Sequence, residues 1–211
     1  FDQDLLHSVD TGVILTYFAA FTVLISSLIA LSQDNLKRRL AFSTISQLGY
    51  ITVGISMLAS GALAGVESPQ AMTGSVLHIA MHACGKITLF FCAGAINVAL
   101  HKTEISDMVG IGKQMPFTMI AFFIGALSVI GVPPLGGSWS KWYLALGAAE
   151  GHHAVFVAVL MISSLLSVAY LMPVVGRAFL FSPSPSGSAT GAPESPGASE
   201  TNPAEGTFWS N

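Results

Sequence analysis

The chain has 211 residues, of which 52% are hydrophobic and 9% are charged, and its formal net charge is −3. Soluble domains carry about 25% charged residues, so this composition excludes an ordinary soluble domain and indicates the lipid bilayer as the solvent. The charge balance does not indicate nucleic acid as a partner. We therefore expect an all-α, polytopic membrane protein.

Both ends of the chain lack an apolar pattern. Residues 1–10 are polar and include three Asp, and residues 182–211 are rich in Ser, Pro and Gly. These compositions predict a polar lead-in on the outer side of the membrane and a disordered tail or linker, respectively. Because the chain starts at Phe1 and shows no signal peptide, we expect it to be part of a longer protein.

Five segments between residues 11 and 181 are long and apolar enough to cross a membrane, which takes about 20 residues. They run from about Thr11 to Leu31, Leu40 to Ala59, Thr73 to Ala99, Phe117 to Ala149 and Ala154 to Phe181. The fourth segment is too long for one ordinary span.

The fourth span is predicted to break at Val132–Ser138, which contains Pro133, Pro134, Gly136 and Gly137. Proline removes a backbone donor and clashes with the preceding helical turn, and adjacent glycines add backbone freedom. A broken helix at membrane depth is tolerated where it is buried in protein or lines a cavity. Such helices often mark the ion path of a transporter.

Basic residues fall in alternate loops, which predicts the orientation. They are Lys37, Arg38 and Arg39 after the first span, Lys102 and Lys113 after the third, and Arg177, which ends the fifth span. By the positive-inside rule these loops face the cytoplasm, so residue 1 lies outside and the tail inside. The two remaining basic residues, Lys86 and Lys141, lie within spans.

The third span carries His78, His82 and Lys86 at intervals of four residues. On a helix they share one face, and ionisable groups inside a membrane mark ion or proton pathways. Histidine titrates near neutral pH, and a lysine taken out of water releases its proton more readily. The sequence leaves two alternatives open for the histidines: packing residues, or a zinc-binding pair. A lysine as third group disfavours a metal, and we expect none.

Lys141 follows the predicted break and is flanked by Trp139 and Trp142. One interpretation is an interfacial aromatic belt with a lysine that reaches the lipid headgroups. The other, which we favour, is a second buried lysine on an ion path. In the second span, Ser43, Ser46 and Gln47 could join helices by hydrogen bonds or hold water beside the lysines, and Lys37 could be a cytoplasmic anchor.

Three motifs, in this order, resemble one family of membrane proteins. They are the stretch from Asp34 to Tyr50 (DNLKRRLAFSTISQLGY), His78-x3-His82-x3-Lys86, and Gly131-Val132-Pro133-Pro134 followed by Ser140-Lys141. This pattern resembles the antiporter-like subunits of respiratory complex I and the D-type subunit of the multisubunit cation/proton antiporters. Membrane hydrogenase subunits share it. The resemblance covers roughly residues 5 to 181, and the sequence around Lys86 and from Gly110 to Tyr143 favours the D-type branch.

The resemblance implies a fold and site roles. Members have about fourteen helices in two inverted five-helix repeats, so residues 11–181 would be the second repeat, one half of an inverted-repeat transporter fold. It implies that Lys86 and Lys141 match proton-path lysines, that His78 and His82 match polar residues of the central axis, and that Lys37 matches a loop lysine. Gly136-Gly137-Ser138 departs from the commoner small-aromatic version of the motif.

The function expected from these features is proton translocation along a buried Lys/His line, within a complex I-like NADH:quinone oxidoreductase or a cation/proton antiporter. Other membrane subunits would be its partners, in the bacterial inner membrane. The chain shows no dinucleotide fingerprint or cysteine cluster, so we expect no cofactor and leave open whether it counts as an enzyme subunit. Two alternatives remain: a sodium/proton antiporter subunit without redox coupling, and a structural scaffold whose lysines pair with neighbouring carboxylates.

Overall fold

The computed structural model describes residues 11–63, 69–150 and 154–181, and their regular elements are helices. These are α2 (Thr11–Ser32), α3 (Leu36–Leu63), α4 (Pro69–Leu100), the short η1 (Ile105–Asp107) and α5 (Ile111–Gln114), α6 (Pro116–Ile130), α7 (Gly136–Glu150) and α8 (Ala154–Leu180). The expectations for residues 1–10 and 182–211 lie outside the described residues.

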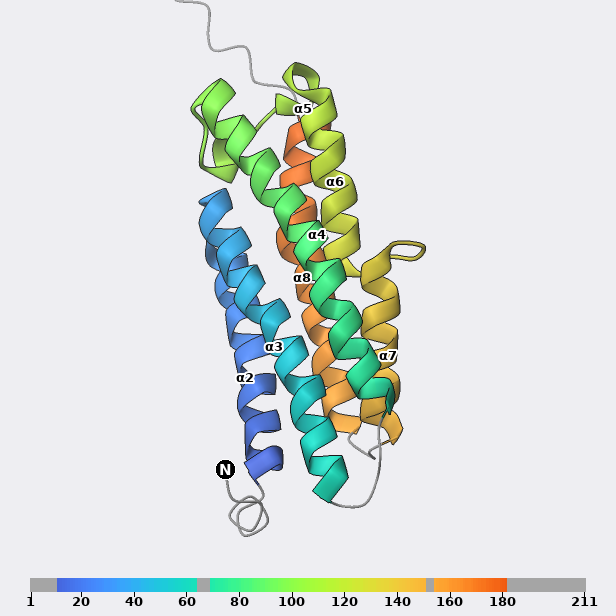
Figure 1. Cartoon of the computed structure of the whole chain (residues 1–211). Helices are drawn as coiled ribbons and strands as arrows, with labels where there is room; N and C mark the ends of the chain where they lie inside the picture. Colours follow the sequence, from blue (N-terminus) through green and yellow to red (C-terminus); the bar gives the residue numbers. More distant parts are fainter. Residues whose placement is uncertain (1–10, 64–68, 151–153, 182–211) are drawn as a thin grey trace, which may run out of the picture.

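The helices form a bundle of five antiparallel passes (Figure 1). Four of them, α2, α3, α4 and α8, are long and apolar enough to cross a membrane. The two shorter helices α6 and α7 follow one another along α4 and together make the fourth pass (Figure 1). The expectation of an all-helical, multi-pass membrane protein with a broken fourth span is therefore confirmed.

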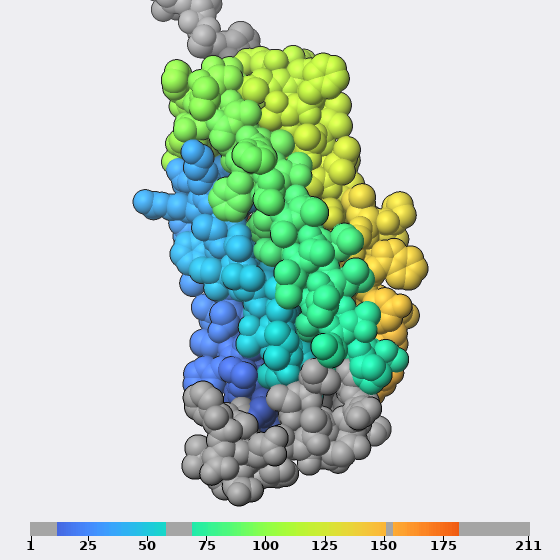
Figure 2. Space-filling view, viewed as in Figure 1, coloured from blue at the N-terminus to red at the C-terminus, as the bar shows by residue number. Residues whose placement is uncertain are grey.

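The distribution of side chains is the reverse of that in a soluble bundle. Large apolar side chains face outward, with Phe91 75% exposed and Phe18 68% exposed. Polar side chains fill the interior, among them Gln47, His78 and Lys86, none of them more than 5% exposed. Lipid tails solvate an apolar exterior without cost, whereas buried polar groups require hydrogen-bond partners. On the face that Figure 2 shows, α3 and α4 lie side by side, with α6 and α7 along one edge.

The break is shorter than the sequence predicted. It runs from Gly131 to Leu135, and α7 already begins at Gly136, so Gly136 and Gly137 are helical rather than part of the break. Gly131 ends α6 with a left-handed φ of 91°, and its N–H donates to the Leu127 carbonyl. Backbone freedom is therefore used at Gly131, before the prolines, and not at the two glycines after them as predicted.

Gly137 has a different role, which is close packing. A Cβ atom on Gly137 would lie 1.8 Å from the carbonyl oxygen of Ser128 in the last turn of α6. The missing side chain lets the start of α7 lie directly against the end of α6. The two half-helices are therefore held together at the break.

The sequence predicted that Arg39 lies in a loop, which is wrong. Arg39 is a buried residue in the first turn of α3 and is 8% exposed. Its guanidinium donates to the carbonyl of Leu31 at the end of α2 and to that of Gln33 just after it. It also donates to the carbonyl of Tyr170 in α8 at 2.9 Å. Carbonyls at the end of a helix lack intrahelical partners. Arg39 supplies these donors and fixes α8 against the α2–α3 turn.

Candidate functional site

Lys86 lies in the middle of α4 and its ammonium points into the bundle. The side chain is 5% exposed. Its Nζ donates to the carbonyl of Leu40 at 3.0 Å and to the hydroxyl of Ser43 at 2.8 Å. Both acceptors are uncharged and belong to α3.

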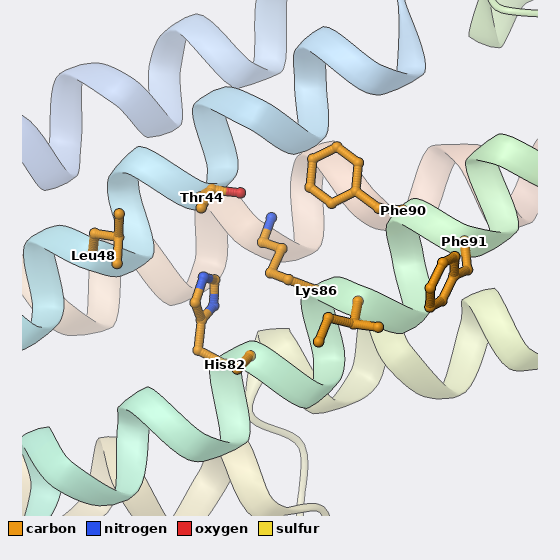
Figure 3. A pocket seen from close by; sticks show the side chains of 8 residues that line it. Thr44, Leu48, His82, Lys86, Phe90 and Phe91 are labelled. Atoms are coloured by element: carbon orange, nitrogen blue, oxygen red, sulfur yellow. The ribbon is translucent and has the colours of Figure 1, made fainter.

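A cavity of about 380 Å³ lies beside Lys86, between α3 and α4. Figure 3 shows the side chains of His82 and Lys86 projecting from α4 toward Thr44 and Leu48 on α3, with Phe90 and Phe91 further along α4. Most of the lining is apolar. His82 and Lys86 are the two lining residues that can bind a proton, so this cavity brings the first two groups of the predicted line together.

The two histidines are stacked. The ring centroids of His78 and His82 are 5.8 Å apart with an interplanar angle of 11°. Nδ1 of His78 lies 2.9 Å from the hydroxyl of Ser140. His78 Nε2 and both ring nitrogens of His82 are buried without a hydrogen-bond partner among the described residues. These imidazoles are therefore only partly satisfied, unlike ordinary packing residues.

Lys141 lies in the second turn of α7 and reaches back to the break. Its Nζ donates to the carbonyls of Val129 and Ile130 at 2.9 and 2.8 Å, and to the hydroxyl of Ser164 at 3.3 Å. The two carbonyls end α6, where the helix dipole is negative and favours a cation. The ammonium thus lies inside the protein at the junction of α6 and α7. Trp139 and Trp142, in contrast, are about 60% exposed.

Tyr50 of α3 joins the histidines to Lys141. Its ring stacks on His78 at 5.4 Å, and the ammonium of Lys141 lies 5.1 Å from the ring centroid. That separation is within the range of a cation–π contact. Its hydroxyl donates to the carbonyl of Leu160 at 3.0 Å and lies 3.4 Å from Ser164 Oγ. Lys86, His82, His78, Tyr50 and Lys141 thus form a continuous set of neighbours, which we call the interior line.

The polar residues of α3 divide into two groups. Ser43 contacts Lys86 directly. Ser46 instead joins helices, because its hydroxyl lies 2.7 Å from that of Ser27 in α2 and 3.3 Å from that of Ser163 in α8. Gln47 Nε2 lies 3.5 Å from Ser167 Oγ, and its Oε1 has no partner among the described residues.

Sequence reasoning missed the contribution of α8. Ser163, Ser164, Ser167 and Tyr170 all face the interior line or the serines beside it. The signal was present, since residues 163, 167 and 170 follow the spacing of one helix face. Lys37 is exposed at the start of α3, and no hydrogen bond joins it to the buried groups in the described part of the chain. No three His, Cys, Asp or Glu side chains gather as a metal site within the described residues.

The chemical capacity of the interior line lies in its amines and imidazoles. Each can bind and release one proton without a covalent change in the protein. A family model described as NADH:quinone oxidoreductase/Mrp antiporter, TM, matches residues 3–167. The chain belongs to this family. The resemblance drawn from the three sequence motifs is confirmed.

Curated relatives come from both branches of the family. The chain is 42% identical over 185 residues to the N subunit of the NADH-quinone oxidoreductase of Desulforudis audaxviator, which covers 88% of this chain and 35% of the relative. It is 32% identical over 169 residues to the D-type subunit of the Na(+)/H(+) antiporter of Alkalihalophilus pseudofirmus, with 80% and 32% covered. The chain therefore spans about a third of the length of these relatives.

Solved structures share the fold. A chain in the structure of the Mrp complex from Dietzia sp. DQ12-45-1b superposes with a TM-score of 0.75 at 27% identity, covering 85% of this chain and 32% of that one. The expected preference for the D-type branch is not reflected in the two curated relatives, since the identity to the oxidoreductase relative is higher. The assignment of residues 11–181 to the second repeat stays a prediction.

Proposed function

We propose that this chain is the part of a longer membrane protein that moves protons along the interior line, between Lys86 and Lys141 through His82 and His78. The carrying observation is that neutral oxygen atoms hold both ammonium groups, that of the buried Lys86 and that of the half-buried Lys141. A lysine held this way can lose its proton without leaving a buried carboxylate unpaired. Each of these lysines can therefore exchange its proton.

The histidines support the same proposal. A buried polar atom without a partner costs about 1–3 kcal/mol, and the interior line contains three such nitrogens, one on His78 and two on His82. Internal water or a polar side chain from the rest of the longer protein would satisfy them. Water at these nitrogens would complete a hydrogen-bonded route between the two lysines.

Assembly and location belong to the proposal as well. The similar structures include multisubunit membrane complexes, such as the Mrp complex and a membrane-bound sulfane sulfur reductase. We infer that this chain works beside other membrane subunits, in a bacterial inner membrane, and that any redox chemistry takes place in those partners. This would make it a subunit of a translocating NADH:quinone oxidoreductase rather than a catalyst by itself.

A second candidate function is sodium/proton antiport without a redox partner. The 32% identity to a component of a Na(+)/H(+) antiporter favours it. The interior line would serve the proton half of the exchange in either case. Proton flux driven by NADH, compared with sodium flux driven by a pH gradient, distinguishes the two candidates in liposomes.

The test of the proposal is Lys86→Ala in the full-length protein, assembled in its complex and reconstituted in liposomes. We expect most proton transport to be lost while assembly persists. Lys86→Arg should not restore it, because arginine essentially never releases its proton. Lys113→Ala, which removes an exposed lysine of α5, is the matched control. Normal transport by the Arg variant would show that Lys86 is only a fixed charge.

A further inference from the structure

A second set of polar groups is connected to Lys86 by hydrogen bonds. It forms a branch separate from the route through the histidines. Ser43 Oγ accepts from Lys86 and lies 2.8 Å from Tyr170 Oη, which lies 3.0 Å from Ser167 Oγ. Ser167 Oγ donates to the carbonyl of Ser163 at 2.9 Å. We call Ser43, Tyr170 and Ser167 the hydroxyl chain, and all three are 0% exposed.

The charge of Lys86 fixes the direction of this chain. An ammonium group can only donate, and each hydroxyl has one proton to give. When Lys86 is charged, Ser43 accepts from it, and the partner in this network that can take the Ser43 proton is Tyr170. Tyr170 then donates to Ser167, whose proton goes to the Ser163 carbonyl. Every proton in the chain points away from Lys86.

A neutral Lys86 permits the opposite direction. The amine then has a lone pair and can accept from Ser43, while Tyr170 donates to Ser43 and Ser167 donates to Tyr170. Only hydroxyl protons rotate, and the oxygen and nitrogen atoms keep their positions. Both charge states of Lys86 therefore find hydrogen-bond partners in the same arrangement of heavy atoms.

Arg39 keeps the chain in place. Its Nη1 donates to the carbonyl of Tyr170 at 2.9 Å, and the same guanidinium is bound to carbonyls at the end of α2. The backbone of α8 at Tyr170 is thereby fixed relative to α3, which carries Ser43. The Tyr170 side chain is itself 0% exposed, so packing around the ring favours keeping its hydroxyl beside Ser43.

We propose that Tyr170 is a positioning residue which, with Ser43 and Ser167, forms a reversible hydroxyl chain whose direction follows the charge of Lys86. The inference rests on the proposed function, since it assigns Lys86 a change of charge during transport. The chain supports the charged form by giving the Ser43 proton an acceptor. Removing Tyr170 Oη or Ser167 Oγ withdraws support from that form, because the direction needed for charged Lys86 then lacks an acceptor.

Other charged or titratable groups around Lys86 also contribute to the pH dependence of proton transport. They are His78 and His82 on α4, Arg39 and Tyr50 on α3, Lys141 on α7 and Tyr170 on α8, while α6 contributes none. None of these is altered in the serine variants used below.

The test compares two serines one turn apart on α8, both 0% exposed. Ser167 belongs to the hydroxyl chain through its hydroxyl, whereas the hydroxyl of Ser163 lies outside that chain and contacts Ser27, Ser46 and Tyr50. Proton transport by the full-length protein in liposomes is measured as a function of pH for Ser167→Ala, Ser163→Ala and Tyr170→Phe. We expect the alkaline limb of the profile to move to lower pH by roughly half a unit to one unit for Tyr170→Phe and in the same direction for Ser167→Ala. Ser163→Ala should leave the limb in place.

Each outcome decides a different point. Unshifted limbs in both Ser167→Ala and Tyr170→Phe, with Lys86→Ala inactive, would overturn the hydroxyl chain and leave the proposed function standing. Full transport by Lys86→Ala would overturn the proposed function itself. An equal shift in Ser163→Ala would show that packing on α8, rather than the chain, sets the profile. If Tyr170→Phe does not assemble, Ser167→Ala against Ser163→Ala carries the test.

Discussion

Adding one methyl group at Gly137 should separate the two halves of the broken helix. The new Cβ would lie 1.8 Å from the Ser128 carbonyl oxygen, and real Cβ atoms do not approach other atoms closer than 3.0 Å. The start of α7 must therefore move from α6 by about 1 Å or more, and over-packing of this kind costs about 1–3 kcal/mol. The clash is with backbone, so no side-chain rotation relieves it.

The same shift should disturb Lys141. Its Nζ bonds to the Val129 and Ile130 carbonyls are 2.9 and 2.8 Å long, and stretching them by about 1 Å takes them outside hydrogen-bond range. Each bond to a charged group contributes about 1.5–3 kcal/mol. We expect Gly137→Ala to lower the melting temperature of the full-length protein. We also expect it to lower the rate of proton transport by tenfold or more.

Alanine substitutions at two other glycines are the controls for Gly137→Ala. At Gly136 the new Cβ would meet Met81 Sδ, a side-chain atom that can rotate away, and at Gly94 it meets nothing within 4 Å. Alanine is also the better helix former. We expect the free energy of unfolding of both variants to lie within about 1 kcal/mol of that of the unsubstituted protein. A Gly137→Ala protein that melts and transports like these controls would refute the close packing of α6 against α7.

Three further predictions address other parts of the molecule. Tyr50→Leu should slow proton transport several-fold, because a cation–π contact contributes about 0.5–2 kcal/mol. Tyr50→Phe keeps the ring and should slow transport less. An equal loss in both variants would assign the effect to the hydroxyl. Arg39→Lys should lower the melting temperature, because an ammonium cannot reach the α2 carbonyls and Tyr170 together; an unchanged melting temperature would contradict this. In a background without native cysteines, thiol labels at positions 60–72 should react from outside and a label at Lys102 from inside, and the reverse accessibility would refute the orientation.

The helical, multi-pass architecture could be predicted from the sequence, because the length of an apolar segment depends on local composition. The break was predicted from Pro133 and Pro134, whose rings cannot continue a helix wherever they lie. The role of Gly137 could not be predicted, since a close approach is a property of two helices and only one of them contains the glycine. The hydroxyl of Tyr170 was missed for a similar reason. It acts on Lys86, which lies 84 positions earlier in the chain, and nothing in the local pattern pairs them.

The two lysines of the interior line differ in what their partners can do. Lys141 is held at 2.9 and 2.8 Å by two backbone carbonyls and faces an aromatic ring, all of which can only stabilise a cation, while the Ser164 hydroxyl lies further away at 3.3 Å. Lys86 is held by one carbonyl and by Ser43, whose hydroxyl can accept from an ammonium or donate to an amine. The described α-helices contain one carboxylate, Glu150 at the last residue of α7, so no buried anion among them locks either charge. We therefore propose that Lys86 changes its charge more readily than Lys141, since Lys141 has more partners that stabilise only a cation. Two like charges in a poorly screened interior repel strongly, so under this proposal a proton that reaches Lys86 favours release of the proton on Lys141.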